Sequence, residues 1–164
     1  MKPLSSIGNC MKRTVFYIGP DTTISEAVTM MVDKRVGTLP VVDENDVLVG
    51  VTTISDIIKI FLPDFVSLLS DIDFIKDYGN LKMPSPETLE KVQNQPVSEI
   101  MEKPVAVEGD SSLIRALSIM HKHNLTDLPV LDQGKLCGIA SRVDIGREFF
   151  SRWRTAKPER QERD

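Results

Sequence analysis

Cysteines are scarce in this sequence, and the two that are present lie far apart. Cys10 and Cys137 are the only cysteines among 164 residues, and neither belongs to a CxxC pair. A disulfide scaffold or a cysteine-rich metal site is therefore not expected, and both residues are interpreted as reduced thiols of a cytoplasmic protein. Cys137 stands in an apolar stretch, which predicts a buried thiol rather than a nucleophile.

Long apolar runs, aromatic residues and excess positive charge are also missing. No apolar run approaches the ~18 residues that a membrane-spanning helix needs. The net charge is −4, and aromatic residues make up 5% of the chain. Binding to nucleic acid depends on Lys and Arg against phosphate and, for single strands, on aromatic stacking. Neither nucleic acid nor a membrane is therefore expected as a partner.

The chain does contain an internal repeat. Residues 24–43 align without a gap with residues 113–132, and residues 50–61 align with residues 138–149. The spacing between the copies is too long for a solenoid, whose repeats recur every 20 to 50 residues or so. The repeat instead predicts two related subdomains packed on each other.

Each copy is predicted to fold as strand, helix, strand, strand, helix, which is an α+β arrangement. Thr23 and Glu26 fit a capping box before a helix whose apolar residues recur every three or four positions. Pro40 and Pro129 are interpreted as strand entrances, since proline cannot donate to a sheet ladder. The predicted strands are residues 14–18, 39–42 and 47–52 in the first copy and 105–107, 128–131 and 136–140 in the second. The predicted final helices are residues 54–61 and 142–150.

The repeat also defines the expected domain organisation. Repeat 1 covers residues 7–62, a helical linker covers 63–96, and repeat 2 covers 97–150. The linker is predicted to contain an amphipathic helix over 64–78 and a short helix over 87–93. Residues 151–164 are predicted to form a polar tail that frays or is disordered.

The doubled motif resembles a pair of CBS domains, the arrangement called a Bateman module. The motif reads LPVVD at Leu39–Asp43 with GVTTISD at Gly50–Asp56, and LPVLD at Leu128–Asp132 with GIASRVD at Gly138–Asp144. The resemblance implies a regulatory, non-enzymatic module whose two sheets pack around a pseudo-twofold axis. It further implies that an adenosine-containing ligand (AMP, ADP, ATP, S-adenosylmethionine or NAD) binds in clefts between the repeats, with no required cofactor.

The resemblance assigns two candidate ligand sites. In each, an Asp at the start of the second helix would bind the ribose, the Ser or Thr three residues earlier would face phosphate, and the other repeat would hold adenine. The first-ranked site comprises Ser141, Asp144 and Arg147 with Val15, Phe16, Ile18, Val36, Gly37, Thr38 and Pro40. The second comprises Thr53, Asp56 and Lys59 with Val105, Ala106, Leu125, Thr126 and Asp127.

The assigned roles agree with the chemistry of these side chains. An ionised carboxylate accepts two hydrogen bonds from a vicinal diol, whereas a hydroxyl and a helix N-terminus suit phosphate. Arg147 and Lys59 lie one helical turn after the Asp and are in a position to reach phosphate. The Asp127 carboxylate would repel phosphate, so the site at Asp56 is ranked second.

Alternative interpretations remain open for these residues. A Ser or Thr followed three residues later by Asp is also a helix N-cap, which needs no ligand. If these residues serve only as helix caps, the chain is expected to be a ligand-free dimerisation scaffold. In either case a homodimer is expected, formed through an exposed apolar face at Ile57, Ile58 and Phe61 or at Phe149 and Phe150. A regulated protein partner is expected but not identified.

No catalytic or metal-binding residue is predicted. His121 and His123 are two positions apart, so they point away from each other on a helix, and no third ligand is near in sequence. Ser141 is not in a G-x-S-x-G nucleophile elbow. An enzyme is therefore the least favoured class of function.

Overall fold

The computed structural model describes residues 6–61 and 85–155. The chain divides into two compact units. The contiguous unit is Phe16–Pro104, and the composite unit combines Met1–Val15 with Val105–Asp164. Each unit is described by itself below.

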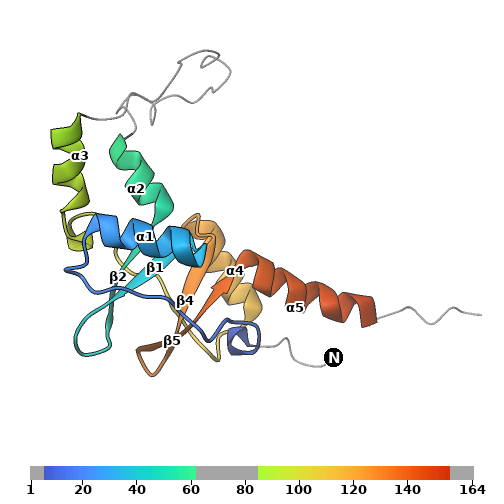
Figure 1. Cartoon of the computed structure of the whole chain (residues 1–164). Coiled ribbons are helices and arrows are strands. Elements are labelled where there is room, and N and C mark those ends of the chain that lie inside the picture. The colour runs from blue at the N-terminus through green and yellow to red at the C-terminus, as the bar shows by residue number, and fades with distance from the viewer. Residues whose placement is uncertain (1–5, 62–84, 156–164) are drawn as a thin grey trace, which may run out of the picture. The chain divides into compact units, whose positions relative to one another are not determined.

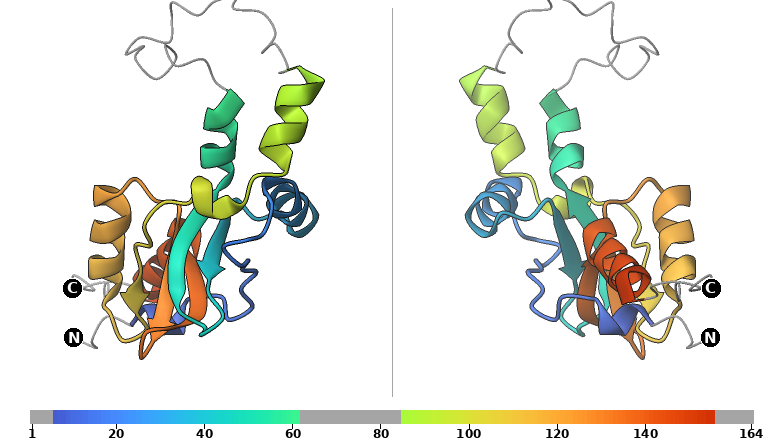
Figure 2. Two further views of the ribbon diagram at one scale, coloured as in Figure 1. Left: turned by 90° about the vertical axis from the view of Figure 1, so that its left-hand side faces the viewer. Right: turned by 90° about the vertical axis from the view of Figure 1, so that its right-hand side faces the viewer.

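The contiguous unit is built on an antiparallel hairpin. Strands β1 (Thr38–Val42) and β2 (Leu48–Thr53) form it, α1 (Ile24–Lys34) precedes it and α2 (Ile54–Phe61) follows it (Figure 1). Helix α3 (Pro86–Gln93) and the 3-10 turn η4 (Val97–Glu99) complete the unit. Figures 1 and 2 show α2 and α3 projecting from the same end of the hairpin. The core consists of Ile18, Ile24, Ala27, Met31, Leu39, Val41, Ile57 and Val97.

The composite unit repeats this plan with a three-stranded sheet. Its order is β3 (Val107–Glu108), β4 (Asp127–Asp132), β5 (Lys135–Ser141), with β3 parallel and β5 antiparallel to β4. Helix α4 (Leu113–Lys122) lies between β3 and β4 in the chain, and α5 (Arg142–Thr155) follows β5. The 3-10 turn η1 (Ile7–Asn9) also belongs to it. The core consists of Ile7, Val107, Leu113, Ala116, Met120, Leu128, Val130, Ala140 and Ile145.

Each unit is closed by a segment that precedes the other repeat in sequence. We call residues 6–15 the first strap and residues 97–104 the second strap. In the first strap, Ile7 N–H donates to the Ser111 carbonyl at 2.9 Å, and Lys12 pairs with Ile139 of β5. In the second strap, Glu102 pairs with Val51 of β2. The straps therefore extend β5 and β2 at equivalent positions.

A methionine of each strap lies over a glycine of the strand that the strap covers. A Cβ atom at Gly138 would overlap the Met11 thioether, and a Cβ atom at Gly50 would overlap the Met101 thioether. Glycine is favoured at both positions because the methionine side chain of the strap occupies the space that a Cβ atom would need.

The structure confirms the predicted helices at both copies of the motif. Helix α2 has the predicted bounds, α5 begins at the predicted Arg142, and α3 covers the predicted short linker helix. The capping box of α1 forms between Thr23 and Glu26. Helix α5 continues to Thr155, so the polar tail predicted from residue 151 begins within a helix. The helix predicted over residues 64–78 lies outside the described residues.

The predicted first strand of each copy is shorter than expected. Over residues 14–18, only Ile18 forms a bridge, which joins it to Val41. In the second copy, β3 consists of Val107 and Glu108 alone. An apolar stretch is a weak signal for a strand when few backbone partners are in reach.

The prediction that the prolines stand at strand entrances was wrong. Pro40 and Pro129 lie inside β1 and β4, opposite Val51 and Ile139. The N–H and C=O groups of Val51 bond to Glu102 of the second strap, so β2 needs no bond from Pro40 at this level. Ile139 bonds to Lys12 in the same way. Each proline therefore stands in a non-hydrogen-bonded pair of its hairpin, so its missing N–H removes no bond to β2 or β5.

Two predictions about burial also need correction. Ile57, expected on an exposed apolar face, is 4% exposed and belongs to the core of the contiguous unit. Ile58, Phe149 and Phe150 are exposed as expected. Cys137, expected to be buried, is half-buried, since its side chain lines a pocket beside the first strap.

No helix within residues 6–61 and 85–155 combines the length and apolar character needed to cross a membrane.

Candidate functional site

The Asp144 carboxylate is held at the first turn of α5. Its Oδ2 accepts the Ser141 backbone N–H at 3.0 Å and the Ser141 hydroxyl at 2.6 Å. The Asp144 N–H donates back to Ser141 Oγ at 3.1 Å. These reciprocal bonds satisfy backbone donors that a helix N-terminus leaves unpaired, so the predicted capping role is confirmed.

The first strap adds a cation to this carboxylate. The Lys12 Nζ atom lies 3.5 Å from Asp144 Oδ2, where the side chains of Lys12 and Asp144 are 62% and 10% exposed, respectively. All of these contacts involve Oδ2. Within the described residues, Oδ1 of Asp144 accepts no hydrogen bond. One oxygen of a largely covered carboxylate therefore retains its capacity to accept hydrogen bonds.

The pKa of Asp144 lies below its ordinary value. Desolvation is the largest influence and acts to raise the pKa, but the hydrogen bonds from Ser141 and the charge of Lys12 together outweigh it. Asp144 is therefore ionised at neutral pH, which is the form that accepts hydrogen bonds through both oxygens.

The Asp56 carboxylate has the same cap but a different second partner. Its Oδ2 accepts the Thr53 N–H at 2.9 Å and the Thr53 hydroxyl at 2.7 Å. Its Oδ1 accepts a hydrogen bond from Lys59 Nζ at 3.1 Å. Both oxygens of Asp56 are thus engaged, in contrast to Asp144.

A second carboxylate stands next to Lys59. Glu102 Oε1 lies 3.9 Å from Lys59 Nζ, so this ammonium group contacts two carboxylates. Glu102 occupies the position in the second strap that Lys12 occupies in the first, because each pairs with the equivalent residue of β2 or β5. The two capped carboxylates therefore have strap neighbours of opposite charge.

The structure divides each predicted site between the two units. The contiguous unit holds Phe16, Ile18, Val36, Gly37, Thr38, Pro40, Thr53, Asp56 and Lys59. The composite unit holds Val15, Val105, Ala106, Leu125, Thr126, Asp127, Ser141, Asp144 and Arg147. The grouping of Asp144 with adenine-binding residues of the contiguous unit, and of Asp56 with those of the composite unit, remains a prediction.

Within each unit, a loop before a strand contacts the start of the capped helix. The Ile54 N–H donates to the Gly37 carbonyl at 2.9 Å, which places Gly37 beside the first turn of α2. The Arg142 N–H donates to the Thr126 carbonyl at 3.1 Å, and its Nε donates to the Leu125 carbonyl at 2.8 Å. These bonds fix the loop backbone against the helix N-terminus.

Lys12 and Glu102 were missed by the sequence prediction. Both belong to straps, and the sequence order assigned them to the repeat that follows rather than to the unit they complete. The sequence does contain a signal that could have identified these two residues. Met11-Lys12 and Met101-Glu102 occupy equivalent places in front of the two copies of the repeat.

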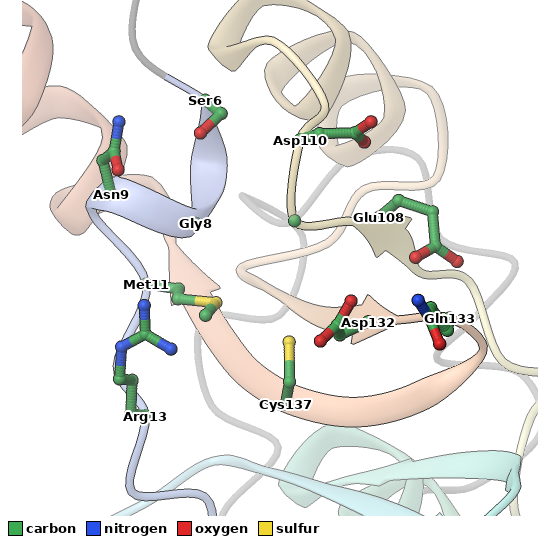
Figure 3. A pocket seen from close by; sticks show the side chains of 11 residues that line it. Ser6, Gly8, Asn9, Met11, Arg13, Glu108, Asp110, Asp132, Gln133 and Cys137 are labelled. Carbon is green, nitrogen blue, oxygen red and sulfur yellow. The ribbon is translucent and has the colours of Figure 1, made fainter.

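A separate pocket of about 480 Å³ lies wholly within the composite unit (Figure 3). In Figure 3 the first strap forms one wall with Met11 and Arg13, and Cys137 points into the space between Met11 and Asp132. None of the predicted ligand-binding residues lines it. No sequence pattern indicates this pocket, since its wall joins segments from opposite ends of the chain.

The thiol in this pocket is not activated. Desolvation, followed by the negative charge of Asp132, raises the pKa of Cys137 above its ordinary value. The reactive form of cysteine is the thiolate, so the raised pKa disfavours a nucleophilic role.

Comparison with known proteins identifies the family. A family model described as CBS domain matches residues 5–63 and 97–150. The chain belongs to the CBS-domain family. A CBS domain-containing protein of Dictyostelium discoideum is 31% identical over 137 residues, which is 82% of this chain and 84% of that protein.

Solved structures of CBS pairs have the same fold. A crystal structure of the CBS-pair protein CBSX2 from Arabidopsis thaliana is 25% identical, covers 94% of this chain and 100% of its own, and has a TM-score of 0.72. A crystal structure of CBSX2 in complex with AMP is 24% identical, covers 91% of this chain and 98% of its own, and has a TM-score of 0.67. The predicted tandem CBS module and its α+β fold are thereby confirmed.

Proposed function

We propose that this CBS pair is a regulatory module that binds an adenosine-containing ligand, with Asp144 as the principal ribose-binding residue. The observation that carries the proposal is the state of the Asp144 carboxylate. It is ionised and held in one orientation by Ser141, and its Oδ1 accepts no hydrogen bond from the described residues. The AMP complex of CBSX2, a protein of the same fold, supports adenosine as the class of ligand.

The cap prepares the carboxylate for a diol. The Ser141 bonds fix the side-chain torsions of Asp144, so little conformational freedom is lost when a ribose binds. A vicinal diol presents two O–H donors to one carboxylate, and hydrogen bonds to a charged acceptor are stronger than neutral ones. The capping role and the binding role therefore use different oxygens of the same side chain.

The proposal includes adenine-binding residues from the other unit. Val15, Phe16, Ile18, Val36, Gly37, Thr38 and Pro40 are proposed for the Asp144 site. Binding between the two units would link ligand occupancy to their packing, and a ligand shifts such an equilibrium only by its differential affinity for the two arrangements. A protein partner would sense the change, and the ligand acts as an effector rather than as a substrate.

A second candidate function is a dimerisation scaffold. Phe149 and Phe150 of α5 are 47% and 54% exposed, and their rings are 5.5 Å apart in an edge-to-face arrangement. Exposed aromatic side chains of this kind favour burial against another surface. We propose a homodimer in addition to ligand binding.

The test is isothermal titration calorimetry of the full chain with AMP and with adenosine. Asp144→Asn keeps an oxygen for the cap but removes the charged acceptor, and it is expected to weaken binding of both compounds at this site by about tenfold or more, given the strength of charged hydrogen bonds. Asp33→Asn makes the same chemical change on an exposed residue of α1 and should leave binding unchanged.

Other calorimetric results would favour a dimerisation scaffold without a ligand, or a different principal site. A folded wild-type protein that gives no heat with either compound would contradict the proposed ligand binding. Equal affinity of wild type and Asp144→Asn, with loss of binding in Asp56→Asn, would move the principal site to Asp56.

A further inference from the structure

The two straps place opposite charges at equivalent positions of the two units. The Lys12 N–H and carbonyl bond to Ile139 at 2.8 and 3.0 Å, and the Glu102 N–H and carbonyl bond to Val51 at 3.0 and 3.1 Å. The backbone geometry is thus the same in both straps. The two residues differ in their side chains. Lys12 contacts Asp144 in the first turn of α5, and Glu102 contacts Lys59 of α2.

Lys59 of α2 and Arg147 of α5, which lie one helical turn after the capped carboxylates, also differ in their contacts. Lys59 bonds to Asp56 and lies within ion-pair distance of Glu102. Arg147 occupies the equivalent place on α5 but forms no ion pair with any described residue, and the cation beside Asp144 is Lys12 of the first strap instead. Its guanidinium group is therefore available to a bound anion.

The local balance of charge follows from these residues. Around Asp56 the helix and strap supply one cation, Lys59, against two carboxylates. Around Asp144 they supply Lys12 and Arg147, against Asp144 itself and Glu148, whose charge acts with that of Asp144 on the Cys10 thiol. A phosphate group meets excess negative charge only at the Asp56 side.

We propose that the two capped carboxylates bind adenosine compounds of different charge. The Asp144 site takes a phosphorylated adenosine compound, with Lys12 and Arg147 as the residues that select for phosphate. The Asp56 site takes an adenosine compound without a phosphate, and Glu102 is the residue that rejects the anion. This inference rests on the proposed function and assigns the class of ligand at each of its sites.

The expected size of the effect follows from Coulomb's law. Lys12, Lys59 and Glu102 have side chains that are 62%, 65% and 70% exposed, so the dielectric constant near that of water applies. One unit charge about 4 Å from another then changes an affinity by about fivefold. Reversal of one strap charge changes the interaction by two units, and we expect a change of about tenfold or more in the preference for AMP over adenosine.

The experiment measures that preference at one site at a time. Asp56→Asn isolates the Asp144 site and Asp144→Asn isolates the Asp56 site, each in the full chain. The ratio of the adenosine Kd to the AMP Kd, from calorimetry at low salt, is expected to be at least about tenfold higher in Asp56→Asn than in Asp144→Asn.

Charge reversal in the straps then tests the assigned residues. Lys12→Glu, added to Asp56→Asn, should lower the ratio mainly through weaker AMP binding. Glu102→Lys, added to Asp144→Asn, should raise it. Lys135→Glu changes the net charge as Lys12→Glu does, but at the far end of β5 from Ser141, and should leave the ratio unchanged.

The outcomes separate this inference from the proposed function. Binding of both compounds with the same ratio at the two sites would overturn the inference alone, as would a ratio that Lys135→Glu changes as much as Lys12→Glu. Binding of neither compound to the folded wild-type protein would overturn the proposed function and this inference with it.

Discussion

The Lys12 ammonium group lies 3.5 Å from Oδ2 of Asp144, although Lys12 is near the start of the chain and Asp144 is in the last helix. This ion pair joins the first strap to the N-terminus of α5 within the composite unit. The same contact helps to keep Asp144 ionised, as the lowered pKa of its carboxyl group shows. Lys12 of the first strap and Ser141 of the helix cap therefore both act on the Asp144 carboxylate.

The Asp144 cap makes stability depend on pH. Because the pKa of Asp144 is lowered in the folded protein, its stabilisation is fully present above the unfolded value near 3.9 and is lost as the pH falls through the folded value. Asp144→Ala is expected to lower the free energy of unfolding by about 1 kcal/mol at pH 7. Urea unfolding at pH 7 and at pH 3 should show a smaller difference from wild type at pH 3. A difference that grows at acid pH would contradict this account.

The glycine and methionine contacts predict a cost for added side chains. Gly138→Ala should destabilise the protein by about 1 to 3 kcal/mol, because the new Cβ overlaps the Met11 thioether and lies 3.1 Å from the Lys12 carbonyl oxygen. Gly19→Ala is the control, since its nearest neighbour would be 3.9 Å away. In denaturant unfolding, Met11→Ala combined with Gly138→Ala should cost less than the sum of the two single changes. Strict additivity would show that the contact is not what requires glycine.

Thr52 offers a stabilising substitution. Its side chain is fully buried, and its hydroxyl has no hydrogen-bond partner among residues 6–61 and 85–155. Ala140, which is buried and apolar, occupies the equivalent position in the second copy. Thr52→Val keeps the shape and removes the unpaired hydroxyl, so it should raise the free energy of unfolding by about 1 kcal/mol. Thr53→Val provides the contrast: thermal unfolding should show a loss of stability, because the cap of α2 is removed.

The exposed aromatic pair predicts the surface used for dimerisation. Phe149→Ser should convert the proposed homodimer to a monomer in size-exclusion chromatography with light scattering at micromolar concentration. Val32→Ser, at a residue of α1 that is 65% exposed, is the matched control. A wild-type protein that is monomeric at this concentration would contradict the dimer, whereas a Phe149→Ser dimer would move the interface elsewhere.

The local parts of the fold could be predicted because their causes are local. Thr53 with Asp56 and Ser141 with Asp144 are three residues apart, so the start of each capped helix follows from the sequence itself. The repeat identified the family for the same reason, since the motif recurs intact at both of these turns.

The straps could not be predicted, because their partners are distant in sequence. The bridge of Lys12 to Ile139 joins positions that no periodicity connects. The charge beside Asp144 and the pocket around Cys137 both depend on the position of the first strap. The sequence therefore predicted the two helix-capping carboxylates but not the charged side chains beside them.

Each strap precedes one repeat in sequence but closes the other unit. This arrangement affects the order in which the protein folds during synthesis. The contiguous unit is complete once Pro104 has left the ribosome, whereas the composite unit draws on both ends of the chain. Residues 6–15 are made before the contiguous unit, whereas β5 and α5, against which they pack, are made after it. A nascent chain would thus carry an earlier-made segment, with Ile7 of the future core, that waits for its partner until the contiguous unit and then β5 and α5 have been made.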